Sequence, residues 1–138
     1  MASKRHILRS IVVQTVFAWE FHGGDPEAIL SYNLVNGAKG DEDQSFALPL
    51  LQNIVKNQKE LKSTIQKFAP EWPWEKIAGV DRAILELSVA ELLYDKTVPA
   101  LVAINEGIEL AKEFGNESSS KFVNGVLSSL YEGLKQSA

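Results

Sequence analysis

Residues 98–127 read "VPALVAINEGIELAKEFGNESSSKFVNGVL", and this stretch contains two helical patterns separated by a stop. Apolar side chains recur at helical spacing in its first half until Gly115 ends the pattern. Three serines follow, and Ser118 or Ser119 is expected to cap a last helix. The apolar positions of the two predicted helices are Leu101, Ile104, Ile108, Ala111, Phe114, Phe122, Val123, Val126, Leu127, Leu130 and Leu134.

Helical patterns also occupy the segments before this stretch. Residues 80–93, "VDRAILELSVAELL", predict a helix with Asp81 as its N-cap. Near the start of the chain, Ser3 is expected to cap a helix that runs to about His22, where two glycines follow.

The middle of the chain predicts three more helices. Asp25 and Pro26 are typical of an N-cap and the first helical residue, and residues 38–45 form a polar loop. The polar residues 56–60 divide the next pattern into two helices, with Pro49 expected in a first turn. Because no alternating strand pattern competes, we expect an all-α fold of about seven helices.

Composition supports one helical domain over residues 1–138, since 45% of the residues are hydrophobic. The chain has no cysteine, and no stretch reaches the ~20 apolar residues of a membrane span. Its two histidines, His6 and His22, stand in no metal-binding motif, and no phosphate-binding loop or nucleophile motif occurs. Acidic pairs such as Glu106 and Glu109 are typical of solvated helix faces. We therefore expect a cytoplasmic protein that is not an enzyme and holds no metal or cofactor.

Charge is distributed unevenly along the chain. The net charge is −4, which argues against a protein that coats nucleic acid by bulk electrostatics, yet residues 1–22 carry +2. A helical wheel of this segment places Arg9, Phe17 and His6 opposite the apolar face, together with Val13. Cations beside an exposed ring suit single-stranded RNA. A solvated helix end, with the ring packed on another helix, explains the same pattern.

The motifs in these segments resemble one family. Residues 98–127 follow the pattern V-P-x-x-V-A-I-N-E-x-I-E-L-A-K-x-F-G and then S-x-K-F-V-N-G-V-L, which is typical of the bacterial NusB family. Residues 80–93 and "LRSIVVQTVFAWEF", residues 8–21, are similar to the family's preceding and first helices. The resemblance covers most of the chain, and residues 24–75 are its least distinctive part.

The resemblance implies a fold of two packed helical bundles and a role in transcription antitermination on ribosomal RNA operons. It implies that the protein binds boxA RNA together with the ribosomal protein NusE. This complex would join a transcription elongation complex that contains NusA, NusG and RNA polymerase. Monomeric and homodimeric states both remain open.

The resemblance also implies roles for particular residues. The implied RNA contacts are Lys4, Arg5, His6, Arg9, Phe17, Ser118, Lys121 and Phe122. The implied contacts with NusE are Glu75 and Asp81. Serine at position 118 replaces an acidic residue that is frequent in the family, which should favour RNA. Ile7 occupies a position where a basic residue is common, so the N-terminal end is expected to bind RNA weakly.

Several polar and small residues are expected to have structural roles. Gly125 is expected to allow a close approach of a neighbouring helix, and Asn124 to bond to backbone at that crossing. Asn105 and Glu106 are expected to form a buried polar bracket, with Arg82 as a partner.

Two other functions remain compatible with the sequence. A ribosomal RNA cytosine methyltransferase family carries a similar N-terminal RNA-binding domain, although the end of this chain at Ala138 leaves no room for a cofactor-binding domain. The second alternative is a helical module that binds only protein, with Phe17 and Phe122 as interface anchors.

Overall fold

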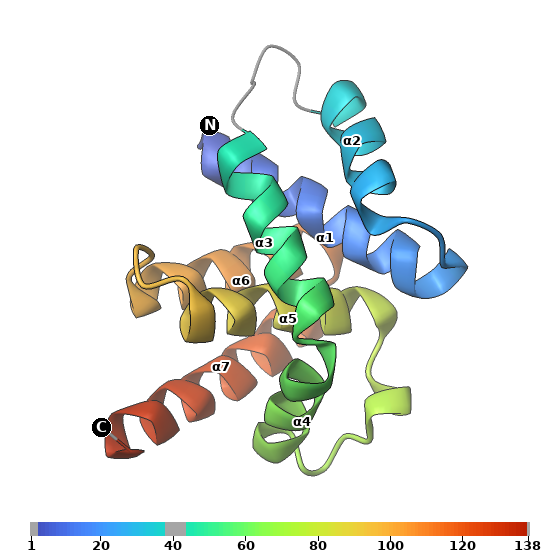
Figure 1. Cartoon of the computed structure of the whole chain (residues 1–138). Coiled ribbons are helices and arrows are strands. Elements are labelled where there is room, and N and C mark those ends of the chain that lie inside the picture. The colour runs from blue at the N-terminus through green and yellow to red at the C-terminus, as the bar shows by residue number, and fades with distance from the viewer. Residues whose placement is uncertain (1–2, 38–43, 138) are drawn as a thin grey trace.

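The computed structural model describes residues 3–37 and 44–137, and the described part consists of helices and their connections without strands (Figure 1). The predicted all-α class is confirmed. The expected loop at 38–45 lies mostly outside the described residues, as do both ends of the expected domain. The elements are α1 (Lys4–His22), α2 (Pro26–Gly37), α3 (Gln44–Lys56), α4 (Gln58–Phe68), the 3-10 helix η1 (Trp74–Lys76), α5 (Gly79–Tyr94), α6 (Ala100–Phe114) and α7 (Glu117–Ser137).

Several predicted helix ends are confirmed. The Ser3 hydroxyl accepts a hydrogen bond from the backbone N–H of His6, and the Asp25 carboxylate accepts one from the N–H of Glu27. Helix α1 ends at His22 and is capped by Gly23, whose φ of 79° is accessible to glycine at little cost.

Other predicted ends are wrong. Asp81 is not an N-cap, because α5 already begins at Gly79. The cap of α7 is Asn116, whose side-chain oxygen accepts a hydrogen bond of 2.9 Å from the N–H of Ser119. Pro49 lies inside α3 rather than in its first turn.

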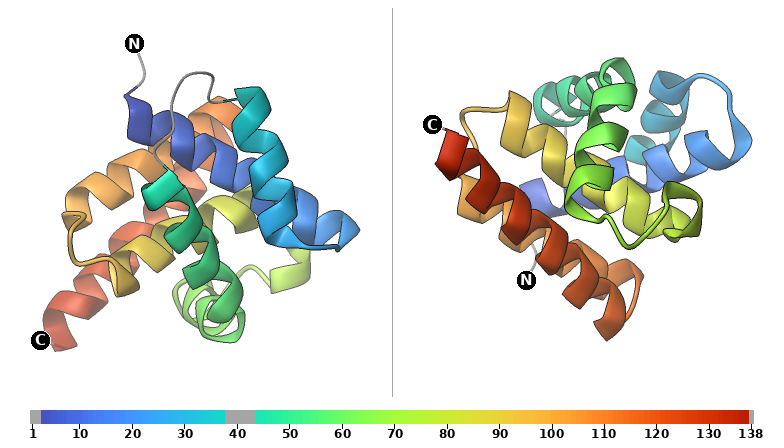
Figure 2. Two further views of the ribbon diagram at one scale, coloured as in Figure 1. Left: turned by 45° about the horizontal axis from the view of Figure 1, so that its top comes forward. Right: turned by 90° about the horizontal axis from the view of Figure 1, so that it is seen from below.

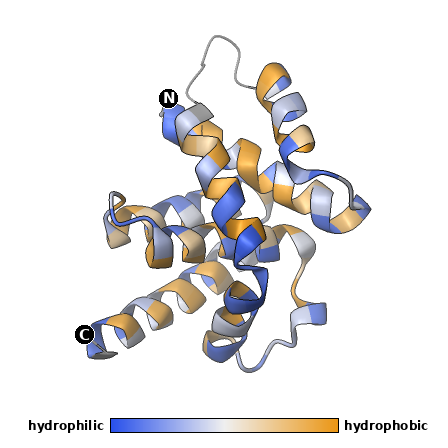
Figure 3. Cartoon of the chain, in the orientation of Figure 1, coloured by the Kyte–Doolittle hydropathy of each residue, from blue (hydrophilic) through white to orange (hydrophobic). Residues whose placement is uncertain are grey.

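Helix α5 is the centre of the molecule, and α1, α3, α4, α6 and α7 all pack against it (Figure 1). Helices α1, α2 and α3 contact one another on one side of α5, while α6 and α7 form a helical hairpin on the other (Figure 2). Helix α4 contacts both α5 and α7. It is mostly hydrophilic (Figure 3), and its buried side chains are Leu61 and Ile65. None of the described helices is both long enough and apolar enough to cross a bilayer.

The glycine that permits a close helix crossing is Gly107, not Gly125. A Cβ at position 107 would lie 2.6 Å from Ser88 Oγ and 2.8 Å from Leu127 Cδ1, where α5, α6 and α7 meet. A Cβ at position 125 would meet no atom of the described residues within 4 Å. Asn124 is likewise exposed rather than at a crossing, and its side-chain oxygen accepts a hydrogen bond from Ser128 of its own helix.

Candidate nucleic-acid interface

A pocket of about 280 Å³ opens at the start of α7, and we call it the α7 pocket. Three helical elements surround it: the first turns of α5 and α7 lie next to each other, and η1 lies beside them. It has an apolar wall, a polar rim and one cation. The residues that line it are Trp72, Lys76, Ile77, Ala78, Asp81, Asn116, Ser118, Ser119 and Phe122.

The apolar wall of the α7 pocket is a pair of aromatic rings. Trp72 and Phe122 meet edge to face, with ring centroids 5.9 Å apart. Half of the surface of Trp72 remains exposed, whereas Phe122 is half-buried against the core. Trp72 precedes η1 in a connection rich in proline, where the preceding helix has already ended.

One acidic group of the pocket is buried. Asp81 Oδ2 accepts a hydrogen bond of 3.4 Å from the Ser119 hydroxyl, and Asp81 Oδ1 has no partner among the described residues. Burial raises the pKa of Asp81, and the hydrogen bond from Ser119 opposes this increase. Glu75, the other residue predicted to meet a protein partner, is exposed on η1. The structure therefore gives these two carboxyl groups very different access to a partner.

The polar residues predicted at the start of α7 face solvent. Ser118 is exposed in the first turn and lines the α7 pocket. Lys121 is exposed, and its Nζ lies 3.8 Å from the carboxylate of Glu117, which is itself exposed. An ion pair this open contributes little, so the ammonium group can move to an anion.

Phe17 lies at the same end of α5 as the α7 pocket. Its exposed fraction is 41%, so the predicted non-core position of this ring is confirmed. A Cβ at Gly79 would lie 3.0 Å from Phe17 Cε1, which places the ring against the first residue of α5. Phe21 stacks beside it, with the two ring centroids 6.2 Å apart.

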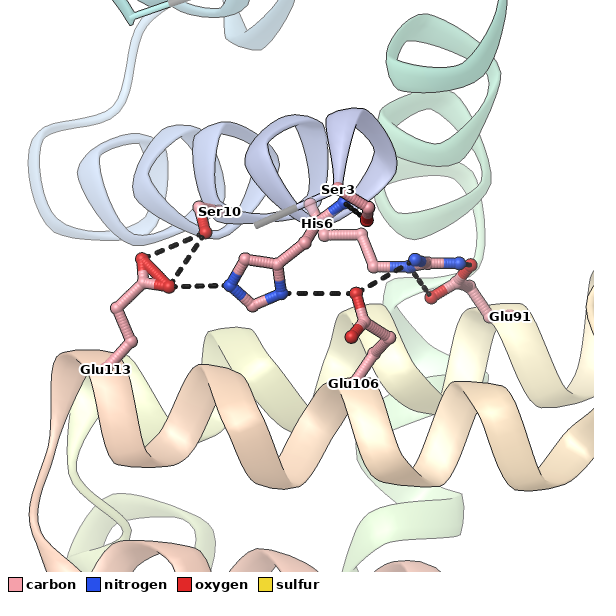
Figure 4. A network of polar contacts seen from close by, with 7 residues as sticks. Ser3, His6, Ser10, Glu91, Glu106 and Glu113 are labelled. Atoms are coloured by element: carbon pink, nitrogen blue, oxygen red, sulfur yellow. Dashed lines mark hydrogen bonds and ion pairs between the residues drawn. The ribbon is translucent and has the colours of Figure 1, made fainter. Parts of the chain in front are cut away.

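Arg9, predicted on the non-core face, is buried instead. Its guanidinium donates two hydrogen bonds of 2.8 Å to the two carboxylate oxygens of Glu91 and a third, of 3.0 Å, to Glu106 (Figure 4). The side chain is 4% exposed, and that of Glu91 is fully buried. Val13, placed on the same face by the helical wheel, is also buried. The wheel prediction was wrong here because α1 is covered by α2, α3 and α5 on several sides.

His6 extends this network along α6. Its Nδ1 lies 3.1 Å from Glu106 and its Nε2 lies 2.7 Å from Glu113, which also accepts hydrogen bonds from Ser10 (Figure 4). Burial lowers the pKa of His6, but the carboxylates of Glu113 and Glu106 more than offset this, so the pKa is raised overall. Glu106 is therefore a partner of His6 and Arg9. The predicted partner Arg82 donates instead to the carbonyl of Trp74.

Lys4 and Arg5 are the exposed cations of the N-terminal end. They line a shallow depression with Pro99 and Val102, at the start of α6. The α7 pocket lies beyond the opposite end of α6, and fifteen residues at ~1.5 Å each separate the two ends by about 22 Å. The structure therefore does not bring Lys4 and Arg5 together with Lys121 at one corner.

Comparison with known proteins agrees with this fold over nearly the whole chain. Residues 6–132 match the NusB family. The chain is 38% identical over 138 residues to the transcription antitermination protein NusB of Dehalococcoides mccartyi (strain ATCC BAA-2266 / KCTC 15142 / 195), covering 100% of this chain and 96% of the relative. It is 38% identical to NusB of Bacillus pumilus over 96% of this chain and 98% of the relative. The chain belongs to the NusB family.

Solved structures agree with this assignment. The NusB structure from T. maritima superposes with a TM-score of 0.85 at 33% identity, covering 96% of this chain and 93% of that one. A chain from the crystal structure of the antitermination factors NusB and NusE in complex with dsRNA superposes with a TM-score of 0.86 at 26% identity, covering 96% and 99%. The NusB fold is thus confirmed, and members of this family are transcription antitermination proteins.

Sequence reasoning missed six of the nine residues that line the α7 pocket, among them Trp72, Lys76 and Asn116. Trp72 carried a signal, because a large aromatic residue between prolines in a connection is more often exposed than buried in a core. Lys76 and Asn116 carried none, since they reach the pocket only through the packing of η1 and the α6–α7 turn against α5.

Proposed function

We propose that this chain is a transcription antitermination factor that binds boxA-type single-stranded RNA of ribosomal RNA operon transcripts together with the ribosomal protein NusE. The observation that carries the proposal is a family match over residues 6–132 in a chain with an aromatic-walled pocket at the start of α7. Residues 1–138 act as one RNA-binding domain and catalyse no reaction. In the cytoplasm, the complex with RNA and NusE joins an elongation complex of RNA polymerase, NusA and NusG.

The shape of the α7 pocket favours an unpaired base over a duplex. Its volume of about 280 Å³ suits one nucleobase, and the Phe122 and Trp72 rings offer apolar surfaces for contact with it. A base must leave its stack to reach such a site, and single-stranded RNA allows this at little cost. Asn116 and Ser118 can exchange hydrogen bonds with the edge of that base.

We divide the predicted RNA residues between two contacts and a pair that acts structurally. Ser118 and Phe122, which line the α7 pocket, form the principal contact together with the neighbouring Lys121, and Phe17 extends it along the end of α5. Lys4 and Arg5 form a second, electrostatic contact at the far end of α6.

His6 and Arg9 are not free to bind phosphate, although Arg9 lines the same depression as Lys4 and Arg5. Their side-chain nitrogens are engaged with Glu91, Glu106 and Glu113, so we infer that they act by holding α1 on α5 and α6. Phosphate would have to displace a buried carboxylate to reach Arg9.

Glu75 is the stronger candidate for contact with NusE. It is an exposed carboxylate on η1, next to the α7 pocket, and a basic ribosomal protein would be attracted to it. Asp81 is buried and lines the pocket, so its effect on NusE is indirect. Replacing Glu75 by glutamine should mainly slow association with NusE.

A titration of labelled boxA RNA, with and without NusE, tests the proposal. Phe122→Ala should weaken binding about 5- to 100-fold, the range expected for loss of one stacked base. Lys121→Gln should weaken it several-fold, whereas Lys135→Gln, which removes an exposed lysine near the end of the same helix, should change it less than twofold.

The proposal fails if the chain binds no single-stranded RNA in the presence of NusE, or if duplex RNA competes as well as the single strand. Binding of NusE with no capture of RNA would favour the protein-only module instead.

A further inference from the structure

A second depression lies on the other side of the Trp72–Phe122 pair. It has a volume of about 270 Å³ and runs between the end of α4 and the exposed face of α7. Trp72 and Phe122 line both this depression and the α7 pocket, so the two rings form a shared wall. We call it the Trp72 groove. Its lining includes Phe68, Trp72, Lys121, Phe122 and Gly125.

Packing among the described residues does not explain why residue 125 is a glycine. It lies in the interior of α7, where alanine would make the helix more stable. It is exposed, and a Cβ there would meet no atom of the described chain within 4 Å. Glycine at such a position is useful when something outside the chain approaches the helix backbone closely. Gly125 lies on the lining of the groove, directly beside Lys121 and Phe122.

The connection that carries Trp72 is fixed in place. The side-chain amide of Gln66 donates a hydrogen bond of 2.8 Å to the Trp72 carbonyl and accepts one of 3.0 Å from the N–H of Trp74. The N–H of Trp72 donates to the carbonyl of Ala69. The backbone at Trp72 is therefore held in a defined place, and its indole packs on Phe122 although half of the residue's surface is exposed, which lowers the entropy lost when a ligand binds.

We propose that the Trp72 groove is a second nucleotide subsite, in which a base stacks on Trp72 and the ribose-phosphate passes over Gly125 with its phosphate near Lys121. This inference rests on the proposed RNA-binding function. The chain would then hold two successive bases on opposite sides of one aromatic wall. Since stacking on a ring accepts any base, Trp72 would increase affinity and the length of RNA held rather than select a sequence.

Charge and size favour RNA over a peptide in this groove. Lys121 lines the Trp72 groove, and Lys76 lines the α7 pocket. The only carboxylate lining the groove among the described residues is that of Glu71. Each depression has room for about one base, whereas an amphipathic helix or strand of a partner would need a longer continuous trough.

Pairing Trp72 variants with abasic RNA tests the subsite directly. One boxA RNA is made in versions that each lack a single base, and each is titrated against the chain with NusE. In the unaltered chain, one missing base should cost about 5- to 100-fold in affinity at the Trp72 position. In Trp72→Ala, that same missing base should cost less than twofold. Trp72→Phe should retain most of the affinity, and Tyr32→Ala, which removes an even more exposed ring on α2, should leave the abasic profile unchanged.

Filling the groove is a second test. Gly125→Leu should weaken RNA binding tenfold or more without lowering the stability of the chain, because the new side chain has open space in the absence of RNA. Ser128→Leu, an exposed position on the same helix outside the groove, is the matched control and should have little effect.

The outcomes separate the two proposals. If Phe122→Ala weakens RNA binding but Trp72→Ala and Gly125→Leu do not, the subsite is wrong and the proposed function stands. If Trp72→Ala weakens binding equally for every abasic RNA, or weakens binding of NusE in the absence of RNA, the groove holds no base and the subsite is again wrong. If the unaltered chain binds no RNA, both proposals fail.

Discussion

Arg9 and Lys121 lie in two regions where cations neighbour aromatic rings, yet of these two residues only Lys121 is free to bind an anion. The exposed Arg5 guanidinium, 4.5 Å from the centre of the same Phe46 ring that Arg9 approaches, is intermediate between them. At the N-terminal end, the Arg9 guanidinium lies 5.0 Å from the centre of the Phe46 ring and is fully engaged by Glu91 and Glu106. At the start of α7, Lys121 is exposed beside Phe122, with one weak ion pair to Glu117. The same residue classes therefore hold the fold together in one region and face solvent in the other.

The difference arises from how many helices meet at each place. Arg9 lies where α1 crosses α5 and α6, and taking a guanidinium out of water there requires carboxylates that satisfy its donors. Lys121 projects from α7, where no helix covers it. Counting cations in a sequence therefore overestimates how many can reach a phosphate.

The largest effect that would test this contrast is loss of the buried ion pair. Arg9→Ala should lower the free energy of unfolding by about 3–5 kcal/mol, because the carboxylate of Glu91 stays buried without its partner. Urea unfolding measures this, and Lys96→Ala, which removes an exposed lysine between α5 and α6, should change it by less than about 0.5 kcal/mol. The double variant Arg9→Met, Glu91→Leu should recover much of the loss. A stable Arg9→Ala protein with reduced RNA affinity would instead make Arg9 a ligand residue.

How far the sequence predicts this arrangement depends on how distant in the sequence the partners of each residue are. Caps such as Ser3 and Asp25 depend on neighbours within three residues, so they were predictable. The partners of Arg9 lie 82 and 97 residues away, and a helical wheel that assumes one covered face cannot supply them. Glu91 follows Val89 and Ala90 and precedes Leu92, and a carboxylate inside such an apolar run was the available signal that a polar partner is needed there.

The candidate site also has a part that the sequence predicts and a part that only tertiary packing reveals. Phe122 and Lys121 were found because a motif names them, whereas the pocket they border is built by three segments distant in sequence. Gly125 and Gly107 look alike in the sequence, each within a helix, and only tertiary packing shows that 107 is the crowded one. Local sequence patterns therefore predict the helices, whereas tertiary contacts determine which polar residues remain accessible.

The next effect in size concerns the two exposed N-terminal cations. Replacing Lys4 and Arg5 together by glutamine should weaken RNA binding roughly tenfold at 0.1 M salt, since each phosphate contact on a single strand contributes about 0.7 to the slope of log affinity against log salt. The slope should therefore fall by up to about 1.4. Titrations between low and moderate salt measure it. An unchanged slope would mean that RNA does not reach this end of α6.

A smaller effect should come from His6 and should depend on pH. Its pKa is raised in the folded protein, so the stability it contributes is fully present below its unfolded value near 6.5 and is lost as the pH rises through the folded value. His6→Gln should therefore cost about 0.5–1 kcal/mol at pH 6 and little at pH 9, measured by urea unfolding at both pH values. A cost that grows toward high pH would contradict the contacts with Glu106 and Glu113.

The smallest expected effect separates affinity from stability at the start of α7. Ser118→Asp adds a carboxylate in the first helical turn, where it interacts favourably with the helix dipole and should stabilise the chain by about 0.3–1 kcal/mol. The same carboxylate lies three residues before Lys121, so it competes with phosphate for that ammonium group and should weaken RNA binding about threefold. Ser129→Asp adds equal charge on the exposed face of the same helix, away from the pocket, and should affect neither property as much. Because stability and affinity should change in opposite directions, unfolding of the helix cannot imitate the result, and a variant that binds RNA more tightly would remove Ser118 from the interface.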